Sequence, residues 1–293
     1  CRPSSTDVSE PAAAPAWFAR AIEASAESRA VDVDGTPIHY LIWNAADTHK
    51  PGLLFAHGFR AHARWWDFIA PFFMSRFRVA SLDFAGMGDS GTRREYTSNS
   101  FTDDLLGVLD HAGFGESATL VGHSFGGGRV MRTCADHPRR VSRAIVIDSH
   151  VHLSDEPRQR HMELRPKRLY PTFEAARTRF RLVPPQNRAA PYILDYVGRH
   201  SLKQVEGGWT WKFDETLMPK WDDVKPRDVL SRIELPVTFI YGDDSAIVSR
   251  QHAHEIVKHI RNCRGPVAIP ESHHHVLLDQ PLSLVSALKA VLY

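Results

Sequence analysis

The segment that most constrains the fold is Gly122-His123-Ser124-Phe125-Gly126. It follows a short apolar run that ends at Val121, and it precedes a stretch with helical spacing. In a Gly-x-Ser-x-Gly pattern placed between a strand and a helix, the chain turns sharply and the serine hydroxyl projects above the sheet. Such a serine lies at a helix N-terminus, where backbone N–H groups favour a developing negative charge. The pattern therefore predicts a nucleophile at Ser124.

Apolar runs and amphipathic segments alternate along most of the chain, which predicts a mostly parallel sheet covered by helices on both faces. A hairpin is expected around Asp34-Gly35. The expected strands are 30–32, 38–43, 53–56, 79–82, 119–121, 144–147, 237–241 and 267–269, and the expected helices are 17–27, 101–111, 126–136, 250–260 and 282–292. The sequence thus predicts an α/β fold.

The alternation stops between about residues 151 and 225. Arginines with helix-like spacing, scattered prolines and an aromatic segment at 209–213 fill this window. We expect residues 151–225 to form a helical insert, residues 29–150 and 226–293 to form the sheet domain, and residues 1–28 to form an N-terminal arm.

Charge and composition favour a small ligand. The 293 residues carry 36 Lys+Arg and 34 Asp+Glu, a net charge of +2, which argues against a nucleic-acid groove. No apolar run is long enough to span a membrane. The three cysteines are widely spaced and predict free thiols in the cytoplasm. The alternative is a lipoprotein anchored through Cys1.

Further motifs resemble those of the alpha/beta-hydrolase family, in its members with a helical cap. His57-Gly58-Phe59 follows an expected strand, and the segment from Asp83 to Ser90 resembles the family's D-x-x-G-x-G-x-S loop. The resemblance implies that the backbone N–H groups of Phe59 and Phe125 form an oxyanion hole. It gives His57, Asp83 and Ser90 the role of shaping loops.

The segment from Glu271 to Pro281 resembles the family's G-H-x-x-x-x-D/E-x-P motif. Alignment on Asp279 and Pro281 makes His274 the catalytic base, with an uncertainty of one residue because His273 and His275 are also histidines. A metal cluster is the rival interpretation of three adjacent histidines. Neighbouring side chains diverge, so we expect no metal site.

The acid has three candidates. Many relatives carry it in a G-x-x-D segment, but here Ser245 stands at that place after Gly242. A smaller set of relatives carries the acid one strand earlier, at the position of Asp148. Asp148 also obeys the Ser, Asp, His chain order of the fold, so we favour it over Asp244, with Asp243 third.

The resemblance implies a serine hydrolase that cleaves a small or medium carboxylic ester through an acyl-enzyme and needs no cofactor. A lactonase, amidase, perhydrolase or carbon–carbon bond hydrolase would use the same residues, and a ligand receptor on a hydrolase scaffold is the alternative from another class. Oligomeric state cannot be read from the sequence. The candidate substrate-binding residues are Arg60, His62, Trp65, His150, Trp209 and Trp211.

Overall fold

A central sheet organises the computed structural model, which describes residues 13–154, 168–220, 222 and 224–293. Within these residues the sheet has eight strands in the order β1-β2-β4-β3-β5-β6-β9-β10. They are β1 (Glu27–Val33), β2 (Thr36–Trp43), β3 (Gly52–Ala56), β4 (Arg78–Leu82), β5 (Ala118–His123), β6 (Val141–Ile147), β9 (Val237–Gly242) and β10 (Cys263–Ile269).

The sheet is mostly parallel. Strand β2 runs antiparallel to both of its neighbours, β1 and β4, whereas every neighbouring pair from β4 to β10 is parallel. The β1–β2 turn has Asp34 and Gly35 at positive φ, 50° and 77°, as a tight hairpin requires. All eight strands predicted from the apolar runs are present, and the predicted α/β class is confirmed.

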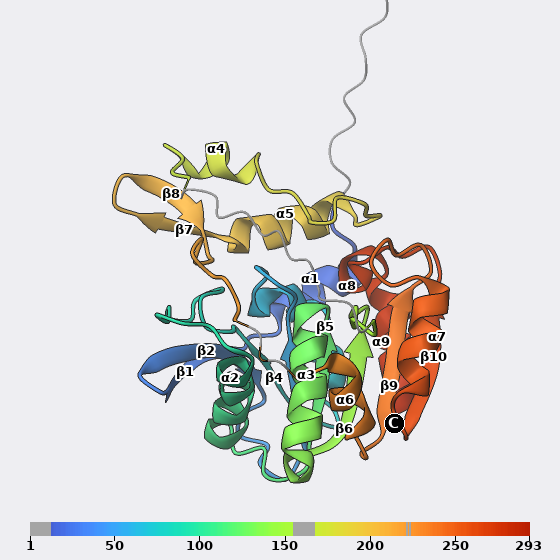
Figure 1. The fold of residues 1–293 in the computed structure, drawn as a ribbon. Helices are drawn as coiled ribbons and strands as arrows, with labels where there is room; N and C mark the ends of the chain where they lie inside the picture. The colour runs from blue at the N-terminus through green and yellow to red at the C-terminus, as the bar shows by residue number, and fades with distance from the viewer. Residues whose placement is uncertain (1–12, 155–167, 221, 223) are drawn as a thin grey trace, which may run out of the picture.

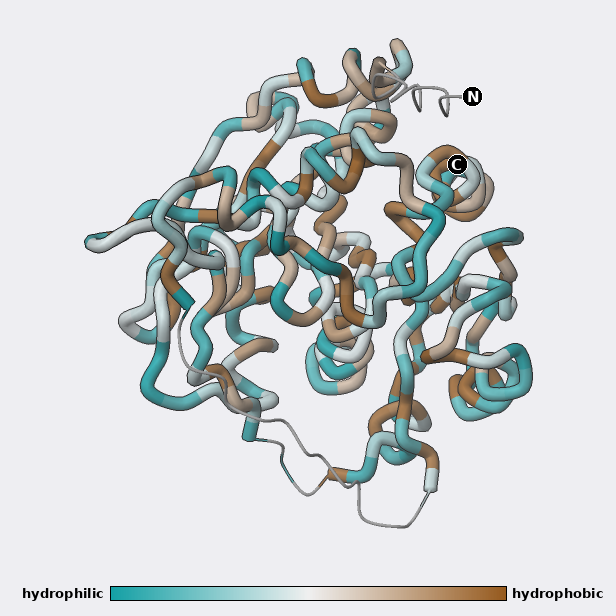
Figure 2. The backbone as a smooth tube through the Cα atoms, turned by 90° about the horizontal axis from the view of Figure 1, so that it is seen from above, coloured by the Kyte–Doolittle hydropathy of each residue, from teal (hydrophilic) through white to brown (hydrophobic). Residues whose placement is uncertain are grey.

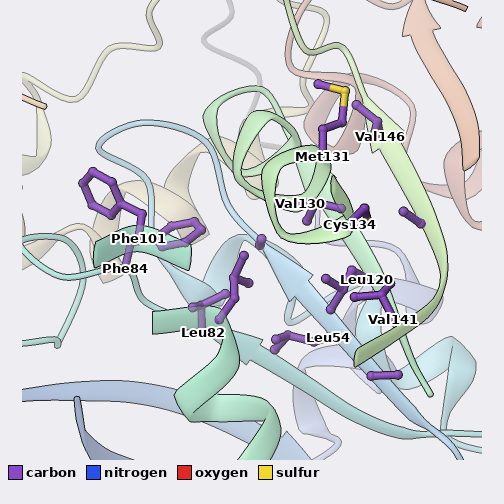
Figure 3. Packing of buried hydrophobic residues seen from close by; sticks show 14 of the residues in the cluster. Leu54, Leu82, Phe84, Phe101, Leu120, Val130, Met131, Cys134, Val141 and Val146 are labelled. Carbon is purple, nitrogen blue, oxygen red and sulfur yellow. The ribbon is translucent and has the colours of Figure 1, made fainter. Parts of the chain in front are cut away.

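Side chains of each strand alternate between two apolar clusters, one on each face of the sheet. In β3, Leu54 and Ala56 belong to one cluster, and Leu53 and Phe55 belong to the other. Figure 3 shows part of the first cluster, in which Leu54, Leu82 and Leu120 of the sheet face Val130 and Cys134 of a helix. Because both faces are covered at the centre of the sheet, central strands such as β3 and β9 are buried at every residue.

Helices cover the two faces in two sets (Figure 1). The first cluster includes residues of α2 (Ser98–His111), α3 (Phe125–Asp136), α6 (Pro226–Ser231) and α7 (Arg250–Lys258). The second includes residues of α1 (Ala16–Glu23), α8 (Val276–Asp279), α9 (Pro281–Leu292) and the 3-10 turns η1 (Ala63–Trp66) and η2 (Ala70–Phe73). A third such turn, η3 (Pro138–Arg140), leads into β6.

Local sequence fixes where these helices begin. The Thr97 hydroxyl accepts a hydrogen bond from the Ser100 N–H at 3.0 Å, and the Ser100 hydroxyl accepts one from the Thr97 N–H at 2.9 Å. This reciprocal capping satisfies two N–H groups that α2 leaves unpaired at its start. In the same way, the Ser249 hydroxyl caps α7 by accepting from His252 N–H at 3.1 Å.

The insert between β6 and α6 forms a layer above the carboxyl ends of the sheet strands (Figure 1). Its described part holds α4 (Phe173–Arg177), α5 (Pro191–His200) and an antiparallel pair, β7 (Leu202–Val205) and β8 (Gly208–Trp211). The helical insert expected from the sequence thus also contains a short strand pair in its last part. Gly207 and Gly208 have positive φ, 84° and 143°, so the chain reverses there and places the aromatic segment on a strand.

The domain boundaries at residues 28, 150 and 225 stay predictions. Seen from above, hydrophobic and hydrophilic stretches alternate along the tube and do not separate into an apolar and a polar half (Figure 2). Among the described residues, no helix combines the length and apolar character that a membrane span requires. Cys1 lies outside the described residues, and the cytoplasmic location stays a prediction.

Candidate active site

Ser124 occupies the turn between β5 and α3. Its φ of 54° is in the left-handed region, which is strained for a residue other than glycine. Glycines on both sides allow this turn. A Cβ on Gly126 would lie 2.5 Å from the carbonyl oxygens of Ala56 and His57, and one on Gly122 would lie 2.6 Å from the Gly126 backbone. The predicted elbow is therefore present, with the serine at the start of α3.

The structure brings Ser124, His274 and Asp148 together. The Ser124 Oγ lies 2.9 Å from the His274 Nε2, and the His274 Nδ1 lies 2.7 Å from the Asp148 Oδ1. The carboxylate accepts from Nδ1–H, so Nε2 carries the lone pair that faces the serine hydroxyl. His274 is 5% exposed and Asp148 is fully buried, so these two side chains are shielded from bulk water, whereas Ser124 is partly exposed.

Three donors hold the Asp148 carboxylate. Besides His274, the Gly242 N–H donates to Oδ2 at 2.8 Å and the Ser245 hydroxyl donates to Oδ1 at 2.8 Å. The Ser245 oxygen in turn accepts from the N–H groups of Ile247 and Val248, both at 3.1 Å. A buried carboxylate needs such donors to remain charged. The contact of Ser245 with Asp148 was missed by sequence reasoning, which singled out position 245 only as a departure from the family pattern.

The other two acid candidates lie elsewhere. Asp244 forms an ion pair with Arg188, with 3.1 Å between Oδ2 and Nη2, and both side chains are about half exposed. Asp243 is exposed as well. His274 pairs with the Asp148 carboxylate at 2.7 Å, so the geometry favours the first of the three candidates.

The neighbouring histidines are close to His274. The His123 ring lies 4.9 Å and the His275 ring 5.0 Å from the His274 ring, measured between centroids. Burial lowers the pKa of His275 to about 3 and holds the pKa of His123 well below its ordinary value. Both rings are therefore neutral near pH 7. His273 is only partly buried.

The residues expected to form the oxyanion hole lie side by side. The rings of Phe59 and Phe125 are 5.6 Å apart. Among the described residues, the Phe59 N–H donates to no hydrogen-bond acceptor, and Phe125 is the first residue of α3. Two hydrogen bonds from side chains to backbone connect the loop after β3 with the loop after β4. His57 Nε2 accepts from the Phe84 N–H at 3.1 Å, and Asp83 accepts from the Ala63 N–H at 2.6 Å.

The substrate-binding candidates fall into two groups. Arg60 and Trp65 lie beside the site: the Arg60 guanidinium is 5.3 Å from the Phe59 ring centroid, and the Trp65 ring is 5.7 Å from that of His275. The others have contacts elsewhere. His62 is buried and its Nε2 lies 2.9 Å from the Ser201 Oγ, while His150 is exposed and stacks on His252. Trp209 and Trp211 pack on Phe173, Tyr170 and Phe180 of the insert.

Two cavities lie along the insert. One of about 390 Å³ is lined by α4, α5 and the segment between them, and one of about 210 Å³ is lined by β8 and the loop from Gly86 to Thr92. Neither is lined by Ser124, Asp148 or His274. The hydrogen-bonded set of side chains, not cavity volume, therefore identifies the candidate site.

Comparison with known proteins agrees with the fold and the motifs. Residues 53–288 match the model of the alpha/beta hydrolase family. The chain belongs to that family. It is 27% identical over 274 residues to esterase Rv0045c of Mycobacterium tuberculosis, covering 89% of this chain and 88% of that protein. A crystal structure of that esterase superposes with a TM-score of 0.72 at 23% identity, covering 94% and 96% of the two chains.

A second relative is the bifunctional esterase/perhydrolase DCH of Acinetobacter calcoaceticus. It is 27% identical over 243 residues, which cover 77% of this chain and 86% of that protein. The chain is thus an esterase-like alpha/beta hydrolase, and the predicted resemblance is confirmed.

Proposed function

We propose that the protein is a serine hydrolase that cleaves small or medium carboxylic esters through an acyl-enzyme on Ser124. The observation that carries the proposal is the continuous hydrogen-bonded set from Ser124 through His274 to Asp148. A serine hydroxyl is a weak nucleophile until an adjacent base accepts its proton. The esterase relatives named above support the choice of ester chemistry.

In the proposed reaction, the Ser124 oxygen attacks the ester carbonyl while His274 Nε2 takes the hydroxyl proton. The backbone N–H groups of Phe59 and Phe125 stabilise the oxyanion, each contributing about 3 kcal/mol in comparable sites. His274 then gives its proton to the leaving alcohol. Water, activated by the same base, hydrolyses the acyl-enzyme, and Asp148 holds the imidazole in one tautomer throughout.

Active-site labelling and turnover test this proposal. We expect a fluorophosphonate to label the protein stoichiometrically and a series of nitrophenyl esters from acetate to laurate to be hydrolysed. Ser124→Ala should abolish both, whereas Ser142→Ala, a change at an exposed serine, should leave both intact. Labelling that survives Ser124→Ala would show that another residue is the nucleophile. A wild-type protein that is neither labelled nor active would instead be a binding protein.

Perhydrolysis is the second candidate, because the name of the Acinetobacter relative includes it. Hydrogen peroxide would then replace water in attacking the acyl-enzyme and release a peracid. Peracid formed from an ester and peroxide by the wild type, and not by Ser124→Ala, would support this candidate.

A further inference from the structure

Three buried histidines surround one point next to the proposed nucleophile. His123 ends β5, and His274 and His275 lie just before α8. One ring nitrogen of each lies within 4.8 Å of one from each of the other two. The exposed fractions of the three residues are 1%, 5% and 4%. This set differs from the run of adjacent histidines in the sequence, because His123 replaces His273.

Hydrogen bonds fix which nitrogen of each ring carries a proton. The His123 Nε2 lies 2.8 Å from the His274 carbonyl oxygen, and the His275 Nε2 lies 3.2 Å from the Pro184 carbonyl oxygen. A carbonyl oxygen only accepts, so each Nε2 is the donor and each Nδ1 keeps its lone pair. In His274 the arrangement is reversed, because Nδ1 donates to Asp148 and the lone pair is on Nε2.

Two of these three lone pairs have no partner among the described residues. Within the described part of the chain, the Nδ1 atoms of His123 and His275 are buried and accept no hydrogen bond. A buried polar atom left without a partner is unfavourable. The third lone pair, on His274 Nε2, faces the Ser124 hydroxyl at 2.9 Å. Each of the three rings therefore has one nitrogen that is bound neither to a backbone carbonyl nor to Asp148.

We propose that His123, His274 and His275 bind a divalent transition-metal ion such as Zn²⁺, and that the bound ion inhibits hydrolysis. Imidazole suits zinc and copper, with Zn–N bonds of about 2.0–2.1 Å. Nitrogens on one tetrahedral ion lie roughly 3.4 Å apart at that bond length, so the rings need to turn inward. A bound ion coordinates His274 Nε2, which is the atom that would accept the Ser124 proton. The inhibition therefore rests on the proposed function, whereas the binding does not.

Binding is tested without any use of activity. Calorimetry of the full chain, purified without a histidine tag, should give one zinc ion per chain for the wild type and for Ser124→Ala. His275→Gln keeps a donor for Pro184 but removes one ligand, so zinc affinity should fall at least tenfold. His273→Gln is the matched control and should bind as the wild type does. Mg²⁺, which prefers oxygen ligands, should not bind.

Inhibition is tested on nitrophenyl acetate hydrolysis. Zinc should suppress the wild-type rate, a chelator should restore it, and His275→Gln should need at least ten times more zinc for half inhibition relative to its own uninhibited rate. Equal zinc sensitivity of His275→Gln and His273→Gln overturns the proposal, as does a wild type without a stoichiometric zinc site. Should His275→Gln not fold, Co²⁺ absorption of the wild type decides: intense tetrahedral bands support the site and a weak octahedral spectrum overturns it.

The two proposals fail separately. If Ser124→Ala retains hydrolysis while calorimetry still detects one zinc ion per chain, the proposed function fails and the metal site stands. If hydrolysis depends on Ser124 but zinc does not bind, the metal site fails alone.

Discussion

Asp148 has an unusual backbone as well as a buried carboxylate. It directly follows β6, and its φ is 46°, a region that Asp tolerates better than most residues because its short side chain bonds locally. This turn directs the carboxylate toward the end of β9, where Gly242 and Ser245 donate to it. Ser245 thus supports the carboxylate from the position at which many relatives carry their own acid.

Exchanging each candidate acid for its amide distinguishes their roles. An amide at position 148 favours the wrong His274 tautomer, so Asp148→Asn should lower kcat by about 10⁴-fold. Asp244→Asn removes only a half-exposed ion pair with Arg188 and should change kcat less than threefold. Steady-state kinetics on one nitrophenyl ester measures both. A larger loss in Asp244→Asn than in Asp148→Asn would reverse the assignment.

At the residue scale, sequence reasoning proposed the set of Ser124, His274 and Asp148 but not the side chains that support it. His274 and Asp148 are 126 positions apart, and Ser245 and Asp148 are 97 apart. The resemblance to relatives that carry the acid one strand earlier, together with the chain order of the fold, ranked Asp148 first among the acids. The support from Ser245 and the approach of His123 to His275 depend on how strand ends meet in space, which no local pattern encodes.

The elbow at Ser124 joins β5 to α3, and its close packing predicts the effect of a substitution at Gly126. Gly126→Ala places a methyl group against the Ala56 and His57 carbonyl oxygens, which are backbone atoms that cannot swing aside. We expect a loss of more than about 2 kcal/mol in unfolding free energy and loss of ester hydrolysis.

Gly128→Ala is the matched control for that change. Its Cβ would enter open space in the same helix, and alanine favours a helix over glycine by up to about 1 kcal/mol. This variant should be as stable as the wild type or more so. Urea denaturation compares the two, and an unimpaired Gly126→Ala would contradict the close packing of the elbow.

At the element scale, the central strands of the sheet were predictable because burial on both faces makes them short apolar runs. The β7–β8 pair was not. Its strands are only four residues long and carry a mixed pattern, Leu-Lys-Gln-Val and Gly-Trp-Thr-Trp. The available signal was the glycine pair at 207–208 between them, but the arginine spacing earlier in the insert favoured helices.

At the scale of the whole molecule, specific polar contacts attach the insert to the sheet domain. The Tyr196 hydroxyl donates to Asp67 at 2.6 Å, the Arg188 N–H donates to Asp279 at 2.8 Å, and His62 contacts Ser201. The sequence predicted that an insert exists, yet none of these pairs is a motif. His62, expected to bind substrate, instead lies within this interface.

The burial of His62 predicts how stability depends on pH. Burial lowers its pKa from 6.5 to about 3 in the folded state, while the unfolded chain takes up the proton near pH 6.5. The unfolded state therefore binds more protons between these values, and the free energy of unfolding falls as the pH falls below 6.5. One such proton accounts for about 1.4 kcal/mol between pH 7.5 and 5.5.

His62→Gln removes this one titration, so its free energy of unfolding should fall less than that of the wild type between pH 7.5 and 5.5. His49→Gln changes an exposed position and should behave as the wild type. Burial also raises the pKa values of Asp67 and Asp104 to about 6, which opposes the acid destabilisation equally in all three proteins. Only the difference between variants therefore isolates His62. Urea titrations at pH 7.5, 6.5 and 5.5 measure it, and parallel curves for the wild type and His62→Gln would mean that His62 is not held neutral between the insert and the sheet domain.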